Sequence, residues 1–196
     1  MENYIKYLNF IDEKLTKFFD SQKPFIVCKK GCGKCCKNAI FPYSLMEMNY
    51  LLAGMMLLDE EIQDIIAENV SKILKEKETF QGEKFRYTCP FLINDECAVY
   101  DYRGVICRSF GLMTQDKEHK IKVPFCCFDG LNYSNVVDFD TNKVSPEKYE
   151  KLGCKEEPTG FNVSYEFLTN PEFEKEFNFK FGDKKPLIDW FIKPEN

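Results

Sequence analysis

The sequence has no apolar run long enough to cross a membrane. A membrane-spanning helix needs roughly 18 apolar residues, whereas the longest run here, Leu51–Leu58, has eight. The first residues, Met1–Lys6, also lack the basic and apolar regions of a secretory signal peptide. We therefore expect a cytoplasmic protein with no membrane partner.

The chain also lacks net positive charge and has little histidine. The net charge is −5, and a nucleic-acid-binding protein needs a basic face, so we do not expect nucleic acid as a partner. His119 is the only histidine. It lies in a hydrophilic stretch, where we expect it at the surface, and one histidine cannot build a histidine-based hydrolytic metal site.

Cysteine, by contrast, is abundant. The chain has 10 cysteines in 196 residues, although a chain of this length can bury a sizeable core without covalent help. Hydrophobic residues make up 44% and charged residues 30%, a balance that excludes a largely disordered chain. Thiols stay reduced in the cytosol, so clustered cysteines there indicate metal ligands or redox chemistry.

The residue pattern outside the cysteines mainly predicts helices. Residues 3–19 carry apolar side chains at three- and four-residue spacing, which indicates an amphipathic helix. Ser44 and Glu47 form a capping-box pattern before a helix over residues 45–56. Asp59 is expected to cap a further helix to about Lys77, and residues 165–180 are helical with an interruption at Pro171.

The region from 81 to 130 has short apolar runs instead. Residues 91–93 and 98–100 flank the turn sequence 94–96 and predict a small β-hairpin, while 101–110 predict a helical turn and 121–123 a short strand. We predict an α+β, mainly helical fold. It forms a single domain over 1–196, with a small irregular β-hairpin lobe organised by a cysteine–metal site. The cysteine region spans about 28–130, followed by a C-terminal extension over 131–196.

Four cysteines in nine residues carry the strongest signal. Cys28, Cys32, Cys35 and Cys36 have the pattern C-x3-C-x2-C-C. Such spacing lets thiolates converge on one centre, as in zinc knuckles and iron–sulfur loops. Gly31 and Gly33 bracket Cys32 and permit the positive φ that such loops need.

The same loop is basic. It contains Lys29, Lys30, Lys34 and Lys37 and no acidic residue. The ammonium groups either offset the charge of a thiolate cluster or simply make the loop a solvated surface.

The other cysteines are more scattered. They are Cys89, Cys97, Cys107, Cys126, Cys127 and Cys154. Cys154 stands alone and is expected to be a packing residue. Adjacent cysteines direct their side chains apart in an extended segment, so each adjacent pair can serve different centres. Two arrangements fit: eight thiolates holding two tetrahedral zinc ions, or fewer thiolates holding one iron centre.

Three arginines lie beside the cysteine segments. Arg86, Arg103 and Arg108 are able to bind a phosphate or carboxylate, or to neutralise the thiolates. The alternative is a structural ion pair with Asp95, Glu96 or Asp101.

The order of these segments resembles a known family. The loop from Cys28 to Cys36 is followed by Cys89-Pro90-Phe91-Leu92, Cys97-Ala98-Val99-Tyr100 and Arg103-Gly104-Val105-Ile106-Cys107-Arg108-Ser109-Phe110. Together they resemble the YkgJ-like cysteine-cluster proteins, a zinc- or iron-chelating domain with a CxxCxxCC signature. The family usually has proline where this chain has Gly104, so we expect a looser turn before Cys107.

The resemblance implies a set of metal ligands but no reaction. The implied ligands are Cys28, Cys32, Cys35, Cys36, Cys89, Cys97 and Cys107, with either Cys126 or Cys127 as a further one. We predict a metal-binding protein that chelates zinc or iron, the latter alone or as an iron–sulfur cluster. An iron–sulfur or iron-dependent redox protein is the alternative. A radical S-adenosylmethionine enzyme is disfavoured because the chain has no βαβ alternation. A Cys32–Cys35 redox pair is disfavoured because it lacks a strand-then-helix context.

Overall fold

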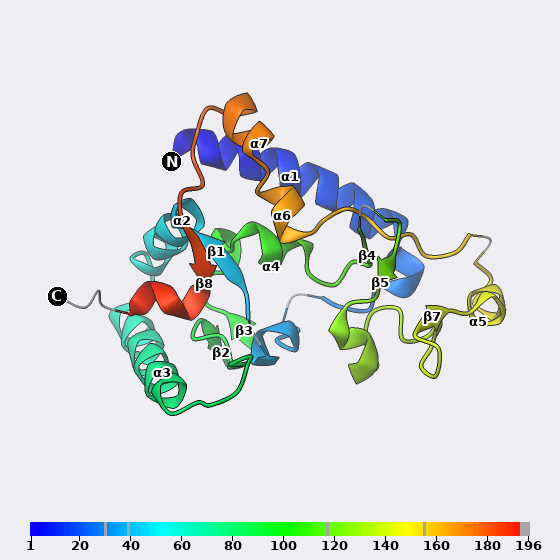
Figure 1. The fold of residues 1–196 in the computed structure, drawn as a ribbon, viewed down its shortest axis with the longest axis horizontal. Helices are drawn as coiled ribbons and strands as arrows, with labels where there is room; N and C mark the ends of the chain where they lie inside the picture. Colours follow the sequence, from blue (N-terminus) through cyan, green and yellow to red (C-terminus); the bar gives the residue numbers. More distant parts are fainter. Residues whose placement is uncertain (30, 39, 117, 155, 193–196) are drawn as a thin grey trace.

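Helices dominate the fold, and short antiparallel strand pairs join them (Figure 1). The computed structural model describes residues 1–196 except 30, 39, 117, 155 and 193–196, so Lys30 of the basic loop lies outside the described residues. The helices are α1 (Glu2–Ser21), α2 (Leu45–Met55), α3 (Glu60–Glu78), α4 (Val105–Ser109), α5 (Pro146–Lys151), α6 (Tyr165–Leu168) and α7 (Pro171–Glu176). This arrangement confirms the mainly helical α+β class.

The described strands form antiparallel pairs that are not joined into a larger sheet. They are β1 (Pro42–Ser44) with β8 (Lys184–Pro186), β2 (Leu92–Ile93) with β3 (Glu96–Cys97), β4 (Thr114–Gln115) with β5 (Ile121–Lys122), and β6 (Val137–Asp138) with β7 (Lys143–Val144). Short 3-10 turns cover Lys23–Phe25, Cys35–Asn38, Tyr100–Tyr102, Phe125–Asp129 and Leu187–Phe191. Of these four described pairs, only β1–β8 joins distant parts of the chain.

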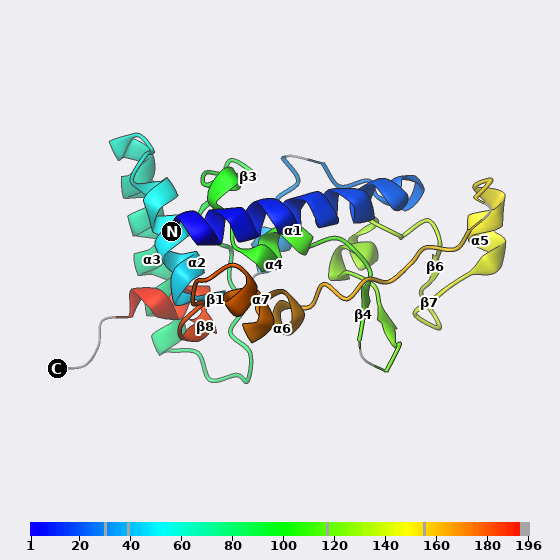
Figure 2. The same ribbon diagram turned by 90° about the horizontal axis from the view of Figure 1, so that it is seen from above.

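Helix α1 runs along the length of the molecule (Figure 2). It buries Tyr4, Tyr7, Leu8, Ile11 and Leu15, the three- and four-residue spacing that predicted an amphipathic helix. Its rings pack with Phe179 and Phe181 near the end of the chain. The N-terminal helix thus closes over a core built partly from C-terminal residues.

Helix α2 begins where the capping box predicts. The Ser44 side chain accepts a hydrogen bond from the Glu47 backbone N–H, and the Glu47 carboxylate accepts one from the Ser44 backbone N–H. Helix α3 likewise follows Asp59, although the Asp59 side chain makes no capping hydrogen bond. Pro171 begins α7, so the interruption between 165 and 180 lies where it was predicted.

The hairpin after Cys89 is confirmed, with a shorter turn than predicted. Asn94 and Asp95 both have positive φ, of 51° and 65°, as the two central residues of a tight hairpin turn require. The return strand therefore begins at Glu96 rather than Ala98. The predicted strand at 121–123 is present as β5, and the predicted helical turn within 101–110 as α4.

The buried side chains form three clusters that share boundary residues. The first lies between α2, α3 and the cysteine segments, the second beneath α1, and the third around Tyr133 and Val137. Ile106 contacts the first and second clusters, and Ile26 contacts the second and third. The cysteine segments line the first cluster, so the packing that holds α2 and α3 also supports the candidate site.

Candidate metal centre

The first cysteine segment is a loop packed against the β2–β3 hairpin. Gly31 adopts a φ of +88°, as predicted for a thiolate-binding loop. A Cβ at Gly33 would lie 2.9 Å from the Leu92 side chain and 3.1 Å from the Asp95 carbonyl. Lys37 forms an ion pair with Asp95 at 2.5 Å. Glycine at position 33 therefore lets the loop approach the hairpin closely.

Backbone hydrogen bonds place the second segment beside the first. The Cys89 N–H donates to the Cys36 carbonyl at 2.7 Å. Cys97 pairs with Leu92 across the hairpin, and the Leu92 N–H donates to the Cys89 carbonyl at 3.0 Å. This pattern brings Cys89 and Cys97, which are far from the loop in sequence, to the same part of the fold.

The third segment is helix α4, which carries Cys107. Its N-terminus is fixed by α2 and β1. The Val105 N–H donates to the Glu47 carboxylate at 2.9 Å, and the Gly104 N–H donates to the Tyr43 hydroxyl at 3.1 Å. Gly104 has φ −66° and ψ 167°. These two hydrogen bonds hold the turn before Cys107, where the sequence predicted a looser one.

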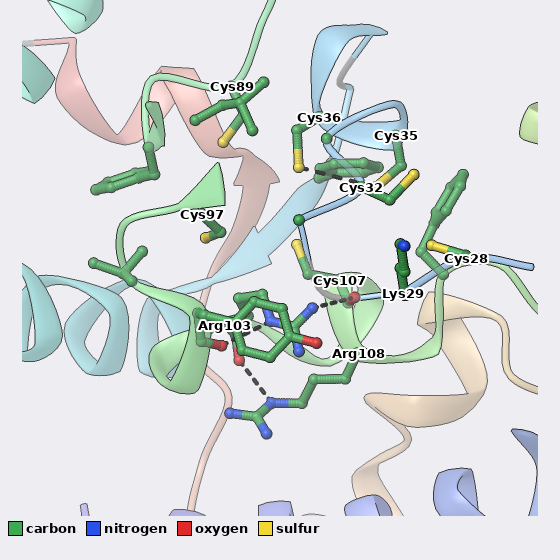
Figure 3. Close-up of a pocket in the computed structure, with 18 of the residues that line it drawn as sticks. Cys28, Lys29, Cys32, Cys35, Cys36, Cys89, Cys97, Arg103, Cys107 and Arg108 are labelled. Carbon is green, nitrogen blue, oxygen red and sulfur yellow. Dashed lines mark hydrogen bonds between the residues drawn. The ribbon is translucent and has the colours of Figure 1, made fainter. Parts of the chain in front are cut away.

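Seven cysteines from these segments line one cavity of about 490 Å³. They are Cys28, Cys32, Cys35, Cys36, Cys89, Cys97 and Cys107. Figure 3 shows them around a shared space, with Cys35 and Cys36 on the opposite side from Cys107. Within the described residues, no three His, Cys, Asp or Glu side chains are grouped closely enough to hold a metal ion as they stand. Coordination would therefore require the side chains to move closer together.

The chemistry of these thiols fits a thiolate-binding cation. Burial, together with repulsion from neighbouring thiolates, raises the pKa of Cys107 to about 12 and also raises the pKa of Cys89. The Cys35 and Cys36 sulfurs form a hydrogen bond at 3.9 Å, which lowers the pKa of Cys35 to about 7. A bound cation attracts the thiolates and so offsets the repulsion between them. It therefore lowers the pKa of the thiols that bind it. The donor set is that of zinc or iron rather than of a hard cation such as magnesium.

The ion pairs suggested for the three arginines, with Asp95, Glu96 or Asp101, are absent from the described residues. Arg108 forms an ion pair with Asp12 at 2.5 Å, not with Asp95, Glu96 or Asp101. Arg103 stacks on Tyr100, 3.5 Å from the ring centre, and donates to the Tyr100 carbonyl at 2.7 Å. Among the described residues, no carboxylate forms an ion pair with Arg103 or Arg86, and Arg103 lines the cavity. Its positive charge therefore faces the thiols, and it favours the thiolate form of Cys35 and Cys107.

Cys126 and Cys127 have different environments. Cys127 is fully buried and packs in the third cluster with Phe25 and Tyr133. Cys126 does not line the cavity, but repulsion from Cys35 adds to burial in raising its pKa to about 12. Of the two, Cys126 is therefore the one that interacts electrostatically with the cluster.

Neither Cys154 nor His119 is among the residues that line the cavity. Cys154 packs against the third cluster, and His119 is exposed. All ten cysteines are free thiols in the structure.

The comparison with protein families agrees with this geometry. A family model described as "CxxCxxCC: Putative zinc- or iron-chelating domain" matches residues 27–128. The chain belongs to this family. The residues matched by the CxxCxxCC model include every cysteine that lines the cavity, as well as Cys126 and Cys127. Neither a search of curated proteins nor a search of solved structures finds a match.

Sequence reasoning missed two residues that support the site. Glu47 was identified only as a helix cap, yet its carboxylate also accepts hydrogen bonds from Val105 and Tyr165. Tyr43 was not singled out, yet its hydroxyl lies 3.3 Å from the Cys107 sulfur. No local pattern identifies either contact, because each depends on packing between distant segments.

Among the described residues, no helix is both long and apolar enough to span a bilayer.

Proposed function

We propose that this protein binds zinc or iron through thiolates of the cysteine cluster. The observation that carries the proposal is that three separate segments direct seven cysteines to one cavity. Cysteines that served only as small buried hydrophobic residues would not be expected to gather around one cavity. A cytoplasmic location is part of the proposal, since a reducing compartment keeps these thiols available.

The ligands are drawn from the cysteines that line the cavity, with Cys126 as the candidate from the adjacent pair at 126 and 127. A tetrahedral zinc site uses about four ligands, so this set exceeds the needs of one ion. We therefore propose a paired or polynuclear centre. Binding would draw the thiols together and stabilise the segments that carry them, because metal-binding free energy adds to folding free energy.

An iron–sulfur or iron-dependent redox protein is the second candidate. Hydrogen bonds to cluster sulfurs tune the reduction potential of iron–sulfur centres. The Tyr43 hydroxyl at Cys107 provides one such contact, which is compatible with this candidate. The same contact is also compatible with zinc, so the metal itself must be measured.

The test is elemental analysis of protein purified without oxygen, together with its visible absorption spectrum. We expect stoichiometric zinc or iron. A coloured sample containing iron and acid-labile sulfide favours the redox candidate, and a colourless sample containing zinc favours a structural centre. The matched variants are Cys89→Ser, which removes a cavity thiol, and Cys154→Ser, which does not. Protein without either metal, or equal metal content in both variants, would contradict the proposal.

A further inference from the structure

A buried tyrosine hydroxyl contacts one of the cavity cysteines. Tyr43 lies on β1 and is only 2% exposed. Its hydroxyl oxygen lies 3.3 Å from the Cys107 sulfur, within the range of a hydrogen bond to sulfur. Neither the family description nor the cysteine pattern includes this residue.

The direction of this hydrogen bond follows from the other contact of the hydroxyl. A tyrosine hydroxyl has one proton to donate and lone pairs that accept. The Gly104 N–H donates to the Tyr43 oxygen at 3.1 Å. The hydroxyl proton still needs an acceptor, because a buried donor without a partner is costly. Among the described residues, the Cys107 sulfur is the remaining partner of the hydroxyl, so we take Tyr43 as the donor and the sulfur as the acceptor.

The surrounding residues contact Tyr43 on several sides. Tyr43 pairs with Lys185 in the β1–β8 ladder, and its carbonyl accepts a hydrogen bond from the Trp190 indole at 3.0 Å. A Cβ at Gly104 would lie 2.9 Å from the Tyr43 ring and 2.8 Å from the Glu47 carboxylate. Glycine at this position therefore permits the close approach of α4 to the tyrosine.

We propose that Tyr43 is a positioning residue of the metal centre, which orients the Cys107 sulfur and donates a hydrogen bond to its thiolate. The inference rests on the proposed metal-binding function. A thiolate carries negative charge and accepts such a bond more strongly than a thiol. Outer groups of this kind orient metal ligands, and their loss typically weakens metal binding by about 10- to 100-fold.

The test compares Tyr43→Phe with Tyr7→Phe. Each variant removes one buried hydroxyl and keeps the ring, but the Tyr7 hydroxyl donates to the Leu168 carbonyl beneath α1, and Tyr7 does not line the cavity. Metal affinity is measured on the full chain by competition with a chelator, using zinc or iron according to the metal found in the purified protein. We expect Tyr43→Phe to bind the metal about 10-fold more weakly than wild type, and Tyr7→Phe to bind it as wild type does. Equal affinities for the two variants would overturn the inference.

A second measurement separates positioning from a general effect on folding. The Tyr43→Phe change is repeated in a Cys107→Ala background, where the sulfur is absent. We expect no further loss of affinity there, because the hydroxyl acts through that sulfur. A further loss of similar size would show that Tyr43 only supports the fold, and would overturn the inference. Wild-type protein that binds neither metal would instead refute the proposed function itself.

Discussion

Replacement of Glu47 by alanine tests how the fold supports the cysteine site. Glu47 is fully buried, and its carboxylate accepts four hydrogen bonds. The donors are the Ser44 N–H at 2.8 Å, the Ser44 hydroxyl at 2.7 Å, the Val105 N–H at 2.9 Å and the Tyr165 hydroxyl at 2.7 Å. This single side chain therefore joins α2 to both α4 and α6.

The magnitude follows from the donors that lose their acceptor. The two hydroxyls can rotate about their C–O bonds, but the backbone N–H groups of Ser44 and Val105 are fixed. Each fixed and buried donor left unpaired costs about 1–3 kcal/mol. We therefore expect Glu47→Ala to lower the free energy of unfolding by about 4 kcal/mol. For a chain of this size, that corresponds to a fall in melting temperature of roughly 8–16 °C.

The assay is urea unfolding followed by far-ultraviolet circular dichroism. The control is Glu68→Ala, which removes an exposed carboxylate from α3 and should change the free energy of unfolding by no more than about 0.5 kcal/mol. A loss below about 1 kcal/mol for Glu47→Ala would be smaller than the cost of leaving even one buried donor unpaired. The role assigned to Glu47 would then be wrong.

Three further changes test the site and the core. We expect Cys32→Ser to lower the melting temperature more than Cys154→Ser, because only Cys32 lines the cavity; thermal unfolding that gives equal values would count against its assignment as a ligand. Cys126→Ser is expected to lower the metal content of the purified protein, while Cys127→Ala leaves it unchanged. The reverse result in elemental analysis would show that Cys127, not Cys126, is the ligand. Phe181 is 1% exposed and lies among the rings beneath α1. We expect Phe181→Ala to lower the free energy of unfolding by about 3–5 kcal/mol. A loss under about 1 kcal/mol in urea unfolding would mean that this ring cluster contributes little to stability.

Local sequence signals predicted the elements whose structure is decided locally. The Ser44–Glu47 capping box located the start of α2 because both partners lie within one turn. The hairpin after Cys89 was predicted from its turn residues, but its return strand was placed too late. The pattern did not show that Asn94 and Asp95 alone make the turn.

Contacts between distant segments were beyond the reach of the sequence. The pairing of β1 with β8 joins residues near 43 to residues near 185, and the Arg108–Asp12 ion pair joins α4 to α1. For the cysteines, spacing and family resemblance identified the set that lines the cavity. They did not separate Cys126 from Cys127, because the orientation of adjacent side chains depends on the 3-10 turn over Phe125–Asp129.

The β1–β8 pair has a consequence for how the protein is made. Tyr43 reaches its final position only when β1 pairs with Lys184–Pro186, and those residues leave the ribosome long after the cysteine segments have emerged. Until Lys184–Pro186 have emerged, the cysteine segments therefore lack the strand that fixes the neighbouring Tyr43. The arrangement around Cys107 is therefore completed only after Lys184–Pro186 have been synthesised, and metal delivered to a shorter nascent chain would meet an unfinished site.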